Sequence, residues 1–229
     1  MSTTTHARTI PDSAASTWSS SGRIAAALCF ALAGALWLAA DLIGFGLDDI
    51  ARLRFLADSP ALAGIGLTCD ALAVPFLCGA VLAWYLLARR SSPRLACIGA
   101  VALVFGLTAQ AMLNGVELSM YQMMTSGRIS ASGLFRALGS NAAPSVPGIT
   151  YQIMFYAGAF AGIIVLMIAV WRSRALPRTA VAFVIAFQLV DLVPIPFPTT
   201  VLAAIGLVWM AIAILRSPVT ASVQDALPR

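Results

Sequence analysis

Residues 62–88 read LAGIGLTCDALAVPFLCGAVLAWYLLA, and Arg89 and Arg90 follow directly. This run holds one charged residue, Asp70, in 27 positions. About 20 consecutive apolar residues are enough for a helix to cross the hydrocarbon core of a bilayer. A charge inside that core is costly and marks a candidate functional site. The stretch therefore predicts a membrane-spanning helix with an acid inside it and a kink at Pro75.

Five further apolar runs accompany this one. The six predicted spans cover residues 24–47, 62–88, 95–116, 149–171, 179–193 and 199–215. The last two runs are short, and Pro194, Pro196 and Pro198 separate them. Because alternate prolines cannot continue a helix, a tight hairpin of two spans is favoured over one long kinked span. The predicted fold is an all-α integral membrane bundle of six transmembrane helices.

The composition agrees with a membrane protein and excludes several kinds of chemistry. The chain is 60% hydrophobic and 10% charged, with a mean hydropathy of +0.92, whereas soluble domains contain about 25% charged residues. It has no lysine, which excludes a Schiff base on a side-chain amine, and its one histidine, His6, lies in a polar tail. We therefore expect no cofactor and no metal site. The four cysteines lie in apolar runs and are expected to be free thiols.

Arginines set the predicted orientation, because cytoplasmic segments carry an excess of basic residues. With both termini in the cytoplasm, ten arginines fall in inner segments, and four (at positions 52, 54, 128 and 136) fall in outer ones. We expect a flexible cytoplasmic tail over 1–22, a six-helix domain over 23–216 with an outer connection over 117–148, and a cytoplasmic tail over 217–229. The net charge of +5 is attributed to these topology signals rather than to nucleic-acid binding.

Polar side chains are expected to gather in the outer half of the bundle. Four acids fall there in this topology, and neutral polar residues accompany them at spacings of three, four and seven, which share one helical face. The candidate pocket comprises Asp41, Asp70, Gln110, Asn114, Glu117, Gln152, Tyr156, Gln188 and Asp191. Among the acids, Asp70 and Asp191 are the strongest candidates.

Two interpretations of this polar set stay open. In one, the side chains line a water-filled pocket that opens to the outside and holds a cation, exchanges protons or binds a polar headgroup. In the other, the acids lie near the interface and only supply polarity at helix ends or hydrogen bonds between helices. Glu117 fits the second interpretation best, because it directly follows the third predicted span and is expected outside the hydrocarbon.

A short motif carries a resemblance to a known family. The segment Trp-Arg-Ser-Arg-Ala-Leu-Pro-Arg at 171–178 resembles the Arg-Ser-x-x-Leu-Pro-Arg connection of a bacterial family of six-span membrane proteins, catalogued as domain of unknown function 4386. The layout over about residues 20–216 is similar, with a Pro-containing connection before a last span that holds Trp209. The chain departs from the family at Arg174 and Ala175, and at Thr199-Thr200, where an acid is missing. The resemblance implies a six-span fold and a bacterial inner membrane, and it implies no activity.

Three function hypotheses follow from these observations. The first is a non-catalytic multi-pass membrane protein whose outward-facing polar pocket binds a small ligand or cation. The second is an integral-membrane enzyme that acts on an isoprenoid or lipid, with Asp70 or Asp191 as general acid. No Asp-rich diphosphate-binding motif supports this hypothesis. The third is a structural or partner subunit of a membrane complex, without a pocket.

Overall fold

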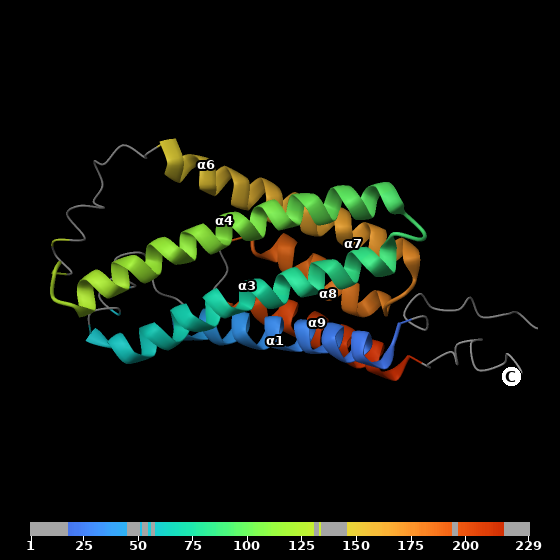
Figure 1. Ribbon diagram of the computed structural model, residues 1–229, viewed down its shortest axis with the longest axis horizontal. Coiled ribbons are helices and arrows are strands. Elements are labelled where there is room, and N and C mark those ends of the chain that lie inside the picture. The colour runs from blue at the N-terminus through green and yellow to red at the C-terminus, as the bar shows by residue number, and fades with distance from the viewer. Residues whose placement is uncertain are drawn as a thin grey trace, which may run out of the picture.

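The computed structural model describes residues 18–44, 51, 55, 58–130, 133, 146–193 and 197–217, and its regular elements there are all helices (Figure 1). These are α1 (Ser20–Gly44), α3 (Pro60–Ala88), α4 (Pro93–Thr125), α6 (Val146–Phe155), the π-helical segment η2 (Tyr156–Ala161), α7 (Gly162–Ser173), α8 (Arg178–Val190) and α9 (Thr200–Arg216). The predicted all-helical class is confirmed for these residues.

Four helices are long and apolar enough to cross a membrane. They are Ser20–Gly44, Pro60–Ala88, Pro93–Thr125 and Ile149–Ser173, the last of which runs through α6, η2 and α7. The helices thus have the length and composition of a multi-pass membrane protein. The two remaining apolar helices, α8 and α9, have 13 and 17 residues, which is about 20 and 25 Å of helix at 1.5 Å per residue.

Local signals explain where several helices begin and end. Pro60 and Pro93 occupy the first turns of α3 and α4, where the missing N–H of proline removes no helical hydrogen bond. Pro75 lies inside α3, which continues through it. The third predicted span ends too early, because α4 continues to Thr125. No glycine or proline interrupts 116–125, and the helix ends just before Gly127, whose φ is +72°.

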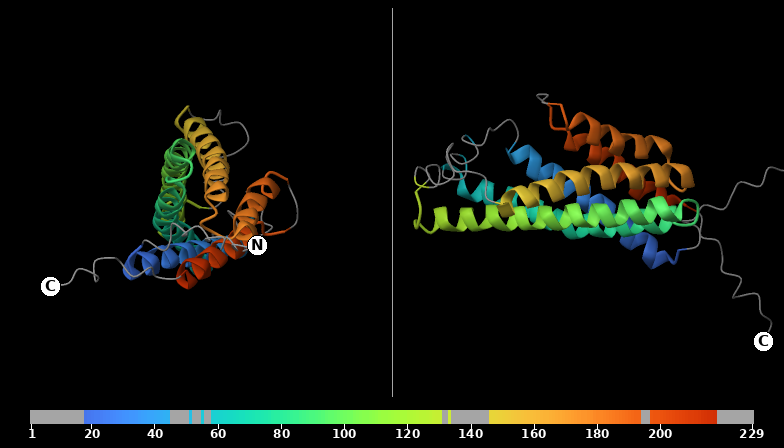
Figure 2. Two further views of the ribbon diagram at one scale, coloured as in Figure 1. Left: turned by 90° about the vertical axis from the view of Figure 1, so that its right-hand side faces the viewer. Right: turned by 90° about the horizontal axis from the view of Figure 1, so that it is seen from above.

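The helices form a ring that is visible from the end of the bundle (Figure 2). Around the ring, α1 packs against α3, α3 against α4, α4 against α6–η2–α7, α7 against α8, α8 against α9, and α9 against α1. A direct contact between α3 and α7 fills the ring at one level. Its core there contains Trp84, Leu166, Met167 and Val170, all at most 1% exposed.

Glycines bring α4 and the η2–α7 segment into backbone contact. A Cβ atom on Gly106 would lie 2.2 Å from the Ala159 nitrogen, and one on Gly162 would lie 2.5 Å from the Leu103 nitrogen. Gly158 meets Gly106 in the same way. The sequence motif Gly158-x-x-x-Gly162 is thus a close helix contact, as its small residues predict.

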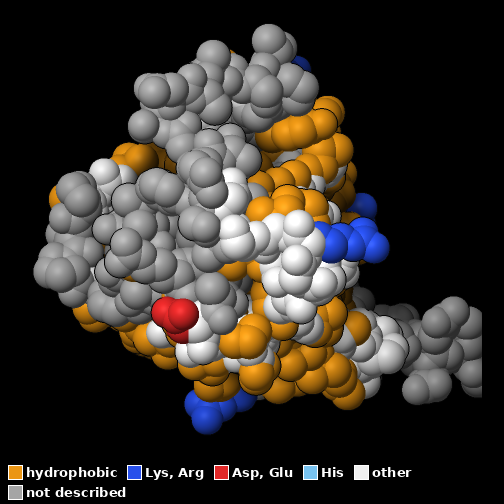
Figure 3. All heavy atoms as spheres, turned by 90° about the vertical axis from the view of Figure 1, so that its left-hand side faces the viewer, with side chains coloured by type: hydrophobic (Ala, Val, Ile, Leu, Met, Phe, Trp, Pro, Cys, Tyr) orange, Lys and Arg blue, Asp and Glu red, His pale blue; other side chains and the backbone are white. Residues whose placement is uncertain are grey.

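The outward faces of the bundle are apolar. Leu82, Ile98 and Phe105 are each more than half exposed. Figure 3 views the bundle from one end, and hydrophobic side chains cover much of the described surface there. Helices that are apolar on all sides are typical of membrane spans. These faces are consistent with contact to a lipid bilayer.

Residues 131–132 and 134–145 of the predicted outer connection over 117–148 lie outside the described residues, as do 1–17 and 218–229 of the predicted tails. The first nine residues of that connection, 117–125, belong to α4. The described helices cover both ends of the predicted six-helix domain over 23–216, since α1 begins at Ser20 and α9 ends at Arg216. Its first turn lies beside the end of α9, because Arg23 donates hydrogen bonds to the carbonyl oxygens of Ile214 and Leu215.

Candidate functional site

A cavity of about 100 Å³ lies inside the ring, beyond the level where α7 contacts α3. Residues of α1, α3, α4, α6, η2, α7 and α8 line it. Much of its lining is buried: Ala73, Trp84, Leu103 and Phe187 are at most 3% exposed. Tyr156 and Leu192, in contrast, are 64% and 61% exposed, so the mouth lies between η2 and the end of α8.

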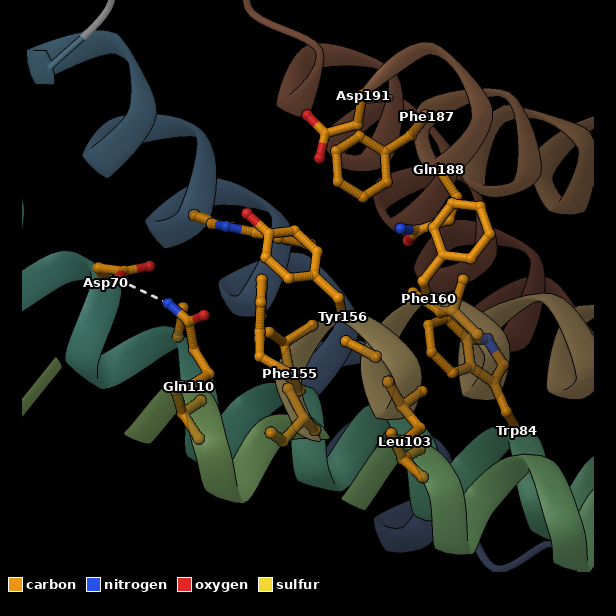
Figure 4. Close-up of a pocket in the computed structure, with 18 of the residues that line it drawn as sticks. Asp70, Trp84, Leu103, Gln110, Phe155, Tyr156, Phe160, Phe187, Gln188 and Asp191 are labelled. Carbon is orange, nitrogen blue, oxygen red and sulfur yellow. Dashed lines mark hydrogen bonds between the residues drawn. The ribbon is translucent and has the colours of Figure 1, made fainter. Parts of the chain in front are cut away.

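Five of the nine candidate residues line this cavity. They are Asp70, Gln110, Tyr156, Gln188 and Asp191. Figure 4 shows Asp70 and Gln110 on one side and Gln188 and Asp191 on the other, with Tyr156 between them. The fold thus brings polar side chains from α3, α4, η2 and α8 to one space, although they lie as far as 121 positions apart in the chain.

The other four candidates lie elsewhere. Asn114 is buried one turn beyond Gln110, and Asp41 faces α9. Glu117 is part-buried on the extended α4, and Gln152 is exposed on α6. These residues do not line the cavity, because its walls end at Gln110 on α4 and begin at Phe155 on the α6–η2–α7 segment.

A hydrogen-bonded set of side chains forms the first polar wall. The Gln110 Nε2 donates to Asp70 Oδ2 at 3.1 Å and to Asn114 Oδ1 at 3.0 Å. Both amide hydrogens of Gln110 are therefore used, and the group that it can still offer to a ligand is its acceptor oxygen. Beyond it, the buried Nδ2 of Asn114 has no hydrogen-bond partner among the described residues.

The second polar wall is tied to the start of α9. The Thr199 hydroxyl donates to Asp191 Oδ1 at 2.6 Å, and the Thr200 hydroxyl donates to Asp41 Oδ2 at 2.5 Å. Both threonines are buried. Carboxylates near a helix N-terminus are stabilised by the helix dipole. Sequence reasoning noted these threonines only as a departure from a family pattern, so it missed their role in holding two of the four acids.

Aromatic side chains make up about a third of the lining residues. Six of the nineteen lining residues are aromatic: Trp37, Trp84, Phe155, Tyr156, Phe160 and Phe187. The chain as a whole is 9% aromatic, so the cavity is strongly enriched. Trp37 meets Phe187 edge-on with centroids 5.1 Å apart, and the Trp84 indole N–H donates to the Met210 sulfur at 3.1 Å. Sequence reasoning missed this wall, because the aromatics come from five separate elements.

The π-helical segment positions one side of the cavity. Tyr156, Ala159 and Phe160 of η2 line it, while Gly158 of the same turn packs against α4. Single π-turns inside α-helices occur frequently at functional sites. The wider turn lets this short segment present large rings to the cavity and backbone to α4.

No group of three or more His, Cys, Asp or Glu side chains that could hold a metal ion occurs among the described residues. The lining polar groups are two carboxylates, two amides and one phenol. These groups can bind a polar or charged ligand through hydrogen bonds and charge.

No known protein family, curated protein or solved structure matches this chain. The resemblance to the six-span family therefore stays a prediction.

Proposed function

We propose that this chain is a multi-pass protein of a bacterial inner membrane whose cavity binds a small polar ligand or cation from the outer side. The observation that carries the proposal is the meeting of Asp70 and Asp191, from α3 and α8, in one space with apolar walls. An acid at membrane depth is costly and is retained where it serves a pathway or a binding site. Interhelical hydrogen bonding alone would not need a cavity between the two acids.

The position of the cavity along the helices supports access from the side opposite the arginine-rich connections at 89–94 and 172–178. Asp70 lies eighteen residues before Ala88, and Asp191 thirteen residues after Arg178, which is about 27 and 20 Å along a helix. The end of α3, at Ala88, and the beginning of α8, at Arg178, lie at the same end of the bundle, as the course of the two helices in Figure 1 shows. A hydrocarbon core of about 30 Å that begins at this end would place the cavity near the far interface.

The six-span topology, with both termini in the cytoplasm, belongs to the same proposal. It requires α8 and α9 to cross as a short pair, which pack side by side. The ten-to-four bias of arginines supports it. Reporters fused after Arg90 or Arg174 are expected to report the cytoplasm, and reporters inserted at Ser126 the outside. A cytoplasmic signal at Ser126 would refute the orientation.

Cysteine accessibility tests the cavity directly. In a background with the four native cysteines changed to alanine, Gln188→Cys is expected to react with a membrane-impermeant thiol reagent added to the outside of spheroplasts. Ser126→Cys, which is exposed at the Thr125 end, is the positive control, and Ala169→Cys, which is fully buried in α7, is the negative control.

We expect Gln188→Cys to label within about tenfold of the rate at Ser126→Cys, because water in a cavity of this size reaches its walls. Labelling as slow as that at Ala169→Cys, in protein that is folded by size-exclusion chromatography, would show that no open cavity exists. The acids would then serve packing alone.

A further inference from the structure

We infer that the ligand of this cavity is an organic cation, a substituted ammonium with an apolar body, either free or as the headgroup of a lipid. The inference rests on the proposed function, because it names the ligand class for the same cavity. Two properties of the lining support it, namely the aromatic walls and the direction of the hydrogen-bonding groups.

The aromatic walls favour a cation with an apolar body. The faces of Trp, Tyr and Phe rings attract an ammonium group within about 6 Å of the ring centroid, and aromatic cages bind quaternary ammonium groups in this way. Rings approach the cavity from α1, α3, η2 and α8, so they surround it instead of forming one patch. Phe187 lies one helical turn before Asp191, so a ring and a carboxylate lie together at the second polar wall (Figure 4).

The polar groups of the lining mainly accept hydrogen bonds. Asp191 offers carboxylate oxygens, and Thr199 donates to one of them from outside the lining. Gln110 has spent both amide hydrogens on Asp70 and Asn114. No arginine is among the lining residues that the structure describes. A site of this kind fits a ligand that brings positive charge or N–H donors, and it does not fit an anion.

The same lining argues against a bare metal ion. Calcium takes six to eight oxygen ligands, and magnesium needs near-ideal octahedral geometry. The lining offers two carboxylates on opposite sides and otherwise mostly apolar surface. An organic cation uses that surface, because its methyl or alkyl groups are buried against the rings.

Binding of choline to the purified full-length protein tests this inference. We would titrate choline and measure tryptophan fluorescence, since Trp37 and Trp84 line the cavity, together with the melting temperature. The neutral isostere 3,3-dimethyl-1-butanol and sodium chloride at equal ionic strength are the controls. We expect saturable binding of choline that the isostere does not reproduce. No saturable change with choline, or equal binding of the isostere, would overturn the inference.

Variants locate the site. Asp191→Asn keeps an acceptor for Thr199 while it removes the charge, so we expect a folded protein with at least about tenfold weaker choline binding. Phe187→Leu removes one ring and is expected to weaken binding by about two- to thirtyfold. Asp191→Glu retains the charge and tests folding separately, and Asp58→Asn, at an exposed acid outside the cavity, is the matched control. Equal affinity of Asp191→Asn and Asp58→Asn would overturn the assignment.

Two experiments distinguish a free ammonium ligand from the headgroup of a lipid. In nanodiscs of phosphatidylglycerol, free choline is expected to bind without a competing lipid. In nanodiscs that contain phosphatidylcholine, a lipid headgroup that enters the cavity would weaken the apparent affinity for choline. Both results support an ammonium site. If Gln188→Cys is labelled but choline fails to bind, the cavity exists and the ligand class is wrong. If Gln188→Cys is inert, the proposed function itself fails.

Discussion

Arg23 joins the first described helix to the last, and its removal is expected to destabilise the bundle. The side chain is 6% exposed. Its Nε donates to the Ile214 oxygen at 3.0 Å, and its Nη2 donates to the Ile214 and Leu215 oxygens at 2.8 and 2.6 Å. These oxygens belong to the last turn of α9, where carbonyl groups lack partners within the helix. A cation at a helix C-terminus is also favoured by the dipole.

The expected loss for Arg23→Ala follows from these contacts. A hydrogen bond from a charged donor contributes about 1.5–3 kcal/mol. Two of the three bonds share one acceptor, and the Leu215 oxygen is only part-buried, so we count two bonds at the lower value. The free energy of unfolding should fall by about 3 kcal/mol, which corresponds to a melting temperature about 6–12 °C lower at 2–4 °C per kcal/mol.

The assay is unfolding of the purified protein in dodecylmaltoside, by titration with SDS and by heating. Arg23→Lys should recover part of the loss, because an ammonium lacks the planar fork that reaches both carbonyl oxygens. Arg90→Ala, at an exposed arginine after α3, is the control for loss of charge. The reasoning is refuted if Arg23→Ala and Arg90→Ala unfold alike, since Arg23 would then act only as a topology signal.

Two further variants test the backbone of the fold. Gly106→Ala should destabilise the bundle, because its Cβ would lie 2.2 Å from the backbone of η2. Gly115→Ala, in the same helix, meets nothing within 4 Å and should raise the free energy of unfolding by up to about 1 kcal/mol. If SDS unfolding shows that both variants change the free energy of unfolding in the same direction, the close contact at Gly106 is contradicted. Arg174 ends α7 with φ of +54°, a conformation that suits glycine, so Arg174→Gly should raise the free energy of unfolding by about 1 kcal/mol and Arg174→Lys should leave it unchanged. A loss of stability in Arg174→Gly would show that the guanidinium makes a contact that matters more than the backbone strain.

Several features of the site could be anticipated from residue types alone. Asp70 and Asp191 stand out because charges are rare in runs of this hydropathy, and Gln110 and Gln188 follow from helical spacing. The boundaries were less predictable: α4 continues nine residues past the predicted end at 116, since polar residues such as Glu117 and Gln122 are good helix formers and end a hydropathy run without ending a helix. The role of Arg23 could not be predicted either, because an arginine that sets topology and one that donates buried hydrogen bonds cannot be distinguished by their sequence context.

The sequence by itself determined that the chain consists of apolar helices, because their length and composition depend only on local residues and on the low polarity of the surroundings they require. Tertiary structure alone decided which polar groups meet. Asp70 lies with Gln110 because α3 packs against α4, and opposite Asp191 because α8 ends beside the cavity. Gly106 and Gly158 let α4 and η2 approach closely, and Tyr156 of η2 lines the same space. Asp41 is turned toward Thr200 instead. Such pairings join residues that lie 40 to 159 positions apart in the chain, so they depend on how the helices pack, and no local pattern encodes them.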